Sequence, residues 1–366
     1  MEVSKGAALE LEKEIDLKIG EVRTDSVDLS FGEIINLHAN KELVIQPEYQ
    51  RLFRWSPEQK SRLIESILLE LPIPQIFVIE NEDGVYELID GLQRISSVLQ
   101  FVEPKQLDLE EFALIGCDLV GNLNGKKNSE LPLSLRLRLK RSSLRTVVIK
   151  RQSKSFLRYE MFKRLNTGGA ILAPQEIRNC SARMLGDIGA KFYAFLQTLS
   201  ADNGFVATTQ SLAAVEIEQK GNEELVLRFL AGANAVDSFR GNVRDWLDDF
   251  MESVLTEKIP FDLNQQGIAF RRVFAAINAK LGETAFVKFR GTSPVGGLAP
   301  AYFEAVSLGA ASAIDQFEAK TSDKLKAKLI ELVQSDDFRD VTGPGANNRT
   351  KLKRRIELVR ESIVAA

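Results

Sequence analysis

The sequence predicts an α+β protein with a mixed N-terminal domain followed by a mostly α-helical C-terminal domain. Strand and helix signals alternate over about residues 30–182, whereas long apolar-periodic segments with few strand signals follow from about residue 183. The chain has 366 residues, of which 44% are hydrophobic, and this is enough for two cores. We therefore expect an acidic lead-in over residues 1–29, a first domain over 30–182 and a helical domain over 183–366.

The first helices have clear local signals. Apolar residues over 31–37 mark a short helix near the start of the first domain. Ser56 suits the N-cap of a second helix, with Pro57 at its first position and Gln59 closing a capping box. Apolar residues at helical spacing then continue to Leu71, so we expect a helix with one buried face.

A β-hairpin and a strand-to-helix junction come next. Residues 76–79 and 85–89 have the apolar, β-branched composition of strands, and Asp83-Gly84 between them suits a hairpin turn. The second strand leads directly into helical spacing over 95–102, and a further strand is expected over 146–149.

The histidine and cysteine counts exclude several classes of protein. The single histidine, His38, excludes multi-histidine metal sites and Cys-His zinc fingers and argues against a His-Asn-His nuclease. Cys117 and Cys180 cannot form a disulfide framework and are most simply free thiols in a reducing compartment. No apolar stretch approaches the length of a membrane span and no signal peptide is evident, so we expect a cytoplasmic protein without membrane contact.

Basic residues concentrate in one stretch of the chain. The formal net charge is −3, yet residues 136–164 hold eleven Lys and Arg residues and one acid. Such a local field attracts polyanions, either nucleic acid or nucleotide phosphates. A solvated basic face is the alternative interpretation, and a second basic cluster over 349–360 leaves the same two interpretations open.

The strongest chemical motif is Asp90-Gly91-Leu92-Gln93-Arg94 at the strand-to-helix junction. A helix start offers free backbone N–H groups and the positive end of the helix dipole, which together favour phosphate. Gly91 allows a close approach or a positive φ, Arg94 can donate two hydrogen bonds to phosphate, and Asp90 can hold Mg²⁺ or orient a water. The structural alternative is a hairpin end capped by Asp90, with Arg94 on a solvated face.

Two further segments combine polar, basic and aromatic residues. Residues 46–55 place aromatic side chains among two arginines, which suits base stacking and phosphate clamping. Their alternative is an ordinary core role for the aromatics and carboxylate pairing for the arginines. Residues 162–179 include the polar loop Asn166-Thr167-Gly168-Gly169, which can present N–H groups to an anion or simply cap a helix.

Together these segments resemble the GmrSD-type restriction endonuclease N-terminal domain family. The family pattern consists of Pro-x-Tyr-Gln-Arg-x-x-x-Trp, Leu-Ile-Glu-Ser-Ile-Leu, Pro-Ile-Pro, Asp-Gly-Gln-Gln-Arg, and Phe-x-Arg-x-Asn-Thr-Gly-Gly with Gln-Glu-Ile-Arg. The corresponding segments here are residues 47–55, 63–68, 72–74, 90–94, 162–169 and 175–178. The resemblance covers about residues 30–182 and implies a ParB/sulfiredoxin-like fold. Leu92 departs from the pattern, because the family has its first motif glutamine there, and this puts turnover in doubt.

The resemblance implies a role in anti-phage defence against foreign DNA. Family members couple nucleotide binding and hydrolysis at the Asp-Gly-Gln-Gln-Arg site to nicking or cleavage of modified DNA. The cut is generally assigned to a His-Asn-His-type module, which needs histidines that this chain lacks beyond His38. The chain therefore resembles the nucleotide-hydrolysing sensor half of a restriction-like system, with cleavage supplied by a partner or absent.

The resemblance and the residue chemistry assign expected roles to individual side chains. Asp90, Gln93 and Arg94 are the expected catalytic residues, with Asp90 on Mg²⁺ and a nucleoside triphosphate as ligand or substrate. The expected nucleotide-binding residues are Arg51, Gly91, Lys163, Arg164, Asn166, Thr167 and Gly168. The expected DNA-binding residues are Tyr49, Gln50, Arg54, Arg141, Arg145, Lys150, Arg151 and Lys154.

Two other functions remain open at this point. One is a DNA-binding or adaptor module that has lost nucleotide hydrolysis, and Leu92 in place of the family's glutamine is the residue that would reflect this loss. The other is a metal-dependent DNA nickase that uses Asp90 and further acids. The expected partners are DNA and a nuclease or other defence-system subunit, while the nucleotide, the DNA modification and the oligomeric state stay open.

Overall fold

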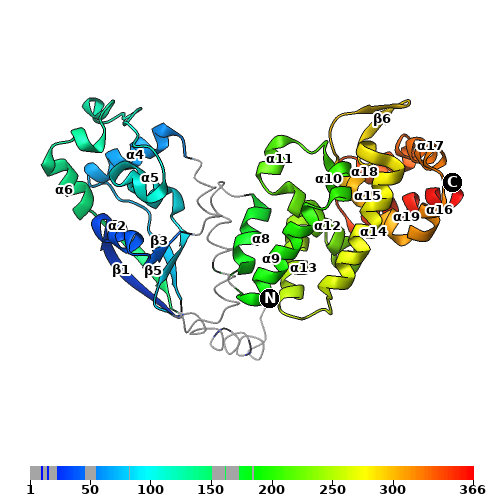
Figure 1. Ribbon diagram of the computed structural model, residues 1–366, viewed down its shortest axis with the longest axis horizontal. Helices are drawn as coiled ribbons and strands as arrows, with labels where there is room; N and C mark the ends of the chain where they lie inside the picture. The colour runs from blue at the N-terminus through cyan, green and yellow to red at the C-terminus, as the bar shows by residue number, and fades with distance from the viewer. Residues whose placement is uncertain are drawn as a thin grey trace, which may run out of the picture. The chain divides into compact units, whose positions relative to one another are not determined.

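The computed structural model divides the chain into two compact units, Met1–Leu172 and Ala173–Ala366, which are described separately (Figure 1). The structure describes residues 23–45, 55–81, 83–150, 173–183 and 185–366, together with Glu10, Ile15 and Met161. The unit boundary lies ten residues before the expected domain boundary, so α8 (Pro174–Arg183) belongs to the second unit by its contacts.

The first unit is an α+β domain built on one mixed sheet. Its described strands are β1 (Thr24–Ser30), β2 (Leu43–Val44), β3 (Ile76–Glu80), β4 (Tyr86–Asp90) and β5 (Ser143–Ile149). Its described helices are α2 (Phe31–Ala39), α4 (Pro57–Leu68), α5 (Leu92–Val102) and α6 (Leu133–Arg141), with short 3-10 turns η1 (Pro104–Leu107), η2 (Gly121–Leu123) and η3 (Asn128–Glu130). Helix α4 packs against both α5 and α6.

The order and direction of the strands place four chain segments at one end of the sheet. The strand order is β1-β5-β3-β4-β2, with β5 parallel to β3 and with β1 antiparallel to β5. Ser30 at the end of β1 lies opposite Ser143 at the start of β5, and Asp90 at the end of β4 lies opposite Phe77 near the start of β3. We call this end of the sheet the Asp90 edge.

The predicted capping box at the start of α4 is confirmed. The Ser56 hydroxyl accepts a hydrogen bond from the Gln59 N–H at 3.3 Å, and the Gln59 side chain accepts one from the Ser56 N–H at 2.9 Å. These two bonds satisfy N–H groups that the first turn of a helix otherwise leaves open. Leu63, Ile64 and Ile67 then form the buried face of the helix, as their spacing predicts.

Strand β1 lies in the segment that the sequence analysis treated as an acidic lead-in. It is an edge strand, and Val27 and Leu29 are half-buried while most of its other residues are exposed. An edge strand with one half-buried face needs few apolar residues, so its composition resembles that of a polar tail. Helix α6 was missed as well, because its arginines and the exposed side chains of Leu133 and Leu137 obscure an amphipathic pattern.

The second unit is helical, as predicted. Its further described helices are α9 (Asp187–Ser200), α10 (Asn203–Thr209), α11 (Ala214–Glu218), α12 (Gly221–Ala235), α13 (Val243–Leu255), α14 (Leu263–Leu281), α15 (Pro300–Ser312), α16 (Ile314–Ala319), α17 (Ser322–Val333), α18 (Asp336–Thr342) and α19 (Arg349–Ala365). Two 3-10 turns, η4 (Val236–Ser238) and η5 (Gly282–Thr284), and one hairpin of β6 (Lys288–Arg290) and β7 (Ser293–Val295) complete the described part. Its core contains a cluster of phenylalanine rings, including Phe205, Phe229, Phe270 and Phe274, whose edge-to-face contacts favour one arrangement of the helices.

Candidate functional site

Asp90 and Arg94 form an ion pair with each other at the junction of β4 and α5. Arg94 Nη2 donates to Asp90 Oδ2 at 2.7 Å and to the Gln75 carbonyl oxygen at 3.0 Å. The side chains are 17% and 31% exposed, so both reach solvent at the Asp90 edge. The guanidinium therefore ties the carboxylate at the end of β4 to the backbone just before β3.

The start of α5 has no side-chain cap. Gly91 is the N-cap residue and supplies no side-chain cap, so the first N–H groups of the helix lack that acceptor. A phosphate near these N–H groups would also meet the positive end of the helix dipole. Arg94 lies on the first turn of the same helix, and the phosphate site that the sequence predicts here stays a prediction.

Gly91 is required by the backbone as well. Its φ is +102°, in the left-handed region, and a Cβ atom at this position would overlap the Ile76 side chain. A residue with a side chain would therefore be strained in two ways at once. The glycine is explained by packing between β3 and the start of α5, whether or not a ligand approaches it.

Gln93 connects two of the motifs identified in the sequence. Its side chain is buried, and Oε1 accepts a hydrogen bond from the Trp55 N–H at 3.1 Å. Trp55 ends the polar-aromatic segment 46–55, so Gln93 anchors the end of that segment to α5. Leu92 precedes it at the first helical position and is half-buried.

Many of the expected site residues lie outside the described part of the chain. These are Tyr49, Gln50, Arg51 and Arg54 in the first segment, Arg151 and Lys154 in the basic stretch, and Lys163, Arg164, Asn166, Thr167 and Gly168 near the polar loop. Their expected roles therefore stay predictions.

Two expected DNA-binding residues, one on β5 and one directly after it, are paired with acids. Arg145 contacts the Asp28 carboxylate on β1 at 2.7 and 3.4 Å. Lys150 lies 3.7 Å from Asp25 and 3.9 Å from Glu80. These pairs reduce the positive field that the sequence count suggests, because each cation has a neighbouring carboxylate in the sheet. Arg141 differs, because it forms no ion pair or side-chain hydrogen bond with residues that the structure describes.

The donor set around Asp90 fits Mg²⁺ only in company with a phosphate ligand. No group of three His, Cys, Asp or Glu side chains suited to a metal occurs among the described residues. Mg²⁺ commonly binds one or two carboxylates and completes its shell with substrate phosphates and water. His38 Nδ1 forms a 2.9 Å hydrogen bond with the Gln106 side chain.

The second unit contains a buried chain of alternating charges that the sequence analysis missed. In order it comprises Asp248 (α13), Arg178 (α8), Glu224 and Arg228 (α12), Glu304 (α15) and Arg355 (α19). The Arg178 side chain is 2% exposed and donates to Asp248 at 2.6 Å, to Glu224 at 3.2 Å and to Gln175 at 2.9 Å. Buried charges are tolerated when each is paired and hydrogen-bonded, as here.

One sequence signal could have indicated this chain. Glu304 is the single charged residue in α15, whose other side chains are apolar or small. A lone acid on a helix that is buried nearly all round requires a basic partner. Arg178 of the Gln175-Glu176-Ile177-Arg178 motif is the second member of this chain of charges, so the motif has a structural role in the helical unit.

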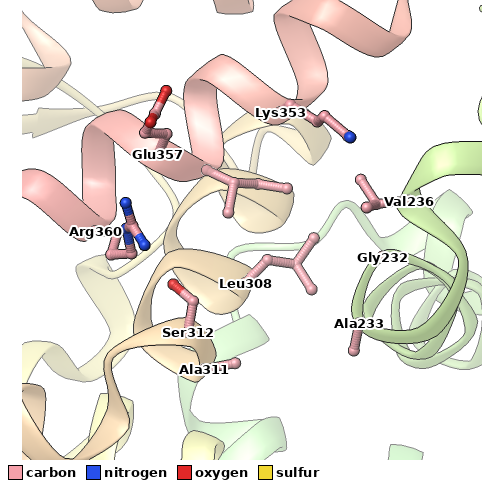
Figure 2. Close-up of a pocket in the computed structure, with 10 residues that line it drawn as sticks. Gly232, Ala233, Val236, Leu308, Ala311, Ser312, Lys353, Glu357 and Arg360 are labelled. Atoms are coloured by element: carbon pink, nitrogen blue, oxygen red, sulfur yellow. The ribbon is translucent and has the colours of Figure 1, made fainter.

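The basic cluster over 349–360 is largely neutralised by its neighbours. Lys353 contacts Asp237, and Arg354 contacts Glu357 at 2.9 Å, while Arg360 has no described acid partner. Figure 2 shows the open groove that this part of α19 forms with α12 and α15. With one unpaired cation on its rim, the groove does not support an anion-binding surface.

Comparisons with known proteins identify the first unit. Residues 31–182 match the model of the GmrSD restriction endonuclease N-terminal domain. The searches of curated proteins and of solved structures found no match. Among the described residues, no helix is long and apolar enough to cross a membrane. The domain over residues 31–182 is therefore similar to the GmrSD restriction endonuclease N-terminal domain family.

Proposed function

We propose that this protein is a nucleotide-binding and nucleotide-hydrolysing DNA sensor in a restriction-like anti-phage defence system. The observation that carries the proposal is the Asp90–Arg94 pair beside an uncapped helix start, within a segment that matches a restriction endonuclease family. In this proposal cleavage of DNA is supplied by a partner chain or is absent, since a His-Asn-His module needs more histidines than His38, the single histidine of the sequence.

The side chains of the motif have distinct tasks in this proposal. Arg94 neutralises the negative charge that develops on the transferred phosphate, with Arg51 as a second cation. Asp90 would contribute a carboxylate oxygen to a Mg²⁺ ion that binds together with the nucleotide, and the Mg²⁺ ion would offset the negative charge of the phosphates. Gln93 orients the attacking water or, through Trp55, positions the segment that holds Arg51. Nucleotide binding would thus be linked to the position of residues 46–55.

The remaining expected residues complete the proposal. Asn166, Thr167 and Gly168 are expected to contact phosphate or ribose, and Lys163 and Arg164 are expected to bind the nucleotide as well. Tyr49 and Gln50 are expected to act in sensing DNA, and the basic residues from Arg141 to Arg164 are expected to follow the DNA backbone. DNA contact through phosphates would be steeply salt-dependent, because each neutralised phosphate releases counterions.

Phosphate release tests the enzyme proposal. Purified protein is incubated with GTP, ATP, CTP or UTP and Mg²⁺, with and without DNA, and compared with Arg94→Ala. The control is Arg62→Ala, which removes an exposed arginine whose contact is Asp118 at 3.2 Å, away from the motif. We expect release by wild type and by the control but not by Arg94→Ala. Release no greater than that of Arg94→Ala with every nucleotide would contradict the proposal.

Leu92 favours one second candidate, a DNA-binding adaptor without turnover. The residue replaces a motif glutamine at the first position of α5, next to the proposed phosphate site. Salt-dependent DNA binding that needs no nucleotide, together with no phosphate release, would support this candidate. Substitution Leu92→Gln separates the two functions further, because a gain of hydrolysis would show that the site is otherwise intact.

A further inference from the structure

A cleft of about 590 Å³ lies at the Asp90 edge of the first unit, on the β1–β5 side. Phe31, Leu71 and Ile73 contribute an apolar surface to it, and Arg138, Arg141 and Ser143 contribute cationic and hydroxyl groups. The lining thus comes from the starts of α2 and β5, the end of α6 and the loop between α4 and β3. These segments meet because the sheet order brings the end of β1 beside the start of β5.

The two arginines of the cleft are available to a ligand. Arg141 is exposed and has no ion pair or side-chain hydrogen bond with any described residue. Arg138 is 51% exposed and is held loosely, since Glu70 lies 3.8 Å away and the Leu68 carbonyl accepts at 3.3 Å. By comparison, Arg145 on β5 is closely paired, since its Nε lies 2.7 Å from the Asp28 carboxylate. Among the described residues, Arg141 is therefore a cation of the cleft without an acid partner, while Arg138 shares the cleft with Glu70.

Glu70 adds a feature to the cleft. It lines the cleft and adopts a positive φ of +56°, a conformation that non-glycine residues rarely take. It is the left-handed residue that commonly ends a helix, because the Glu70 N–H donates to the Ile67 carbonyl at 3.1 Å and the Leu71 N–H donates to the Ser66 carbonyl at 2.9 Å. Here it shapes the loop that supplies the apolar wall.

The same loop connects the cleft to the Asp90–Arg94 pair. Leu71 and Ile73 line the cleft, and two residues later the Gln75 carbonyl accepts the hydrogen bond from Arg94. A ligand that shifts this loop would therefore act on the acceptor of Arg94 directly.

We propose that this cleft binds a nucleotide, with the phosphate on Arg141 and Arg138 and the base against Leu71 and Ile73. A guanidinium pair suits phosphate, an apolar wall suits a base, and the volume lies within the range of small-molecule pockets. The ligand is either a unit of a DNA strand or a free nucleotide. This inference rests on the proposed function and deepens it by adding a second nucleotide position beside the Asp90–Arg94 site.

Binding of labelled probes to matched variants tests the inference. The probes are a fluorescein-labelled short DNA duplex, the corresponding single strand, and fluorescent GTP and ATP analogues, measured by anisotropy or fluorescence titration. The variants are Arg141→Ala, which removes one phosphate contact, and Leu71→Glu, which places a negative charge on the wall. Leu71 is 42% exposed, so the second variant leaves the core intact. The controls are Arg62→Ala and Leu69→Glu, which make the same chemical changes at exposed positions outside the cleft.

We expect Arg141→Ala to weaken binding of at least one probe by about tenfold and Leu71→Glu to weaken the same probe, while the controls bind as wild type. Loss for DNA, with a salt slope reduced by about 1, identifies a strand unit as the ligand. Loss for the analogues identifies a free nucleotide. The inference is overturned if Arg141→Ala and Leu71→Glu bind every probe as tightly as their controls do. It is also overturned if wild type binds none of the probes. Phosphate release that still depends on Arg94 would then leave the proposed function standing.

Discussion

The buried charge chain of the helical unit predicts a large effect for one substitution, Arg178→Met. Methionine is apolar and of similar length, so the change removes the charge and the hydrogen bonds while filling most of the space. Asp248 then loses the guanidinium that donates to it at 2.6 Å, and Glu224 loses one that donates at 3.2 Å. The substitution also removes donors to the Gln175 side chain and to the Arg244 carbonyl oxygen.

The expected cost follows from the burial of these groups. Arg178 is 2% exposed and Asp248 is 10% exposed, so water cannot replace the lost guanidinium well. Removing one partner of a buried ion pair typically lowers the free energy of unfolding by about 3–5 kcal/mol. Since a domain is stable by only about 5–15 kcal/mol, the variant should lose a large part of the stability of the helical unit.

Urea unfolding followed by tryptophan fluorescence measures this loss. Trp246 lies on α13, is 2% exposed and donates to the Ala235 carbonyl at 3.0 Å, so it reports on the second unit. A Trp55→Phe background removes the other tryptophan of the chain. The matched control is Arg272→Met, whose arginine also contacts two acids but is 47% exposed. An Arg178→Met midpoint as close to wild type as that of Arg272→Met would refute the reasoning.

Three further predictions concern the glycine of the motif, the buried thiol and acid stability. In urea unfolding, Gly91→Ala should destabilise the first unit by about 2–4 kcal/mol and Gly84→Ala by about 1 kcal/mol. Both glycines have a positive φ, but an added Cβ at Gly84 would have no atom within 4 Å, whereas one at Gly91 would overlap Ile76. Equal losses of stability in the two variants would contradict the packing argument. Burial raises the pKa of the Cys117 thiol to about 11. In a variant that lacks Cys180, iodoacetamide at neutral pH should therefore alkylate Cys117 roughly a hundredfold more slowly in the folded than in the unfolded protein. Similar alkylation rates in the two states would contradict this prediction. Burial raises the pKa of Glu224, but the neighbouring guanidiniums outweigh burial and hold its pKa below the usual 4.5. Its stabilising contribution is therefore present above about pH 4.5 and is lost as pH falls through the folded value, so the unfolding midpoint of Glu224→Gln should depend less on pH in that range than that of wild type.

Local signals in the sequence predicted the elements that their own residues determine. The Ser56 capping box and the α+β division with a helical second half are examples, since each depends on spacing within a short segment. The position of Asp90 and Arg94 at the end of a strand and the start of a helix was predicted for the same reason.

Features that depend on distant residues were not predicted. Strand β1 pairs with β5, more than a hundred residues away in the chain, and the pairing of Arg145 with Asp28 comes from that register. The sequence therefore shows a run of cations but not the acids beside them. The hydrogen bond from Arg94 to the Gln75 carbonyl oxygen could not be predicted either, because every residue has a backbone carbonyl and the residue type does not indicate which one accepts.

The family match and the contacts divide the chain at different places, and this bears on how its last motif should be interpreted. The match ends at residue 182, yet residues from Ala173 onward pack with the helical unit. Within that overlap, Arg178 joins α8 to α13 and α12 through buried ion pairs. A substitution in the Gln175–Arg178 motif would therefore destabilise the helical unit before it changed any chemistry at Asp90. Loss of activity in such a variant is evidence about a nucleotide site only when the variant is shown to remain folded, whereas Arg94 and Arg141 reach solvent and can be tested for function directly.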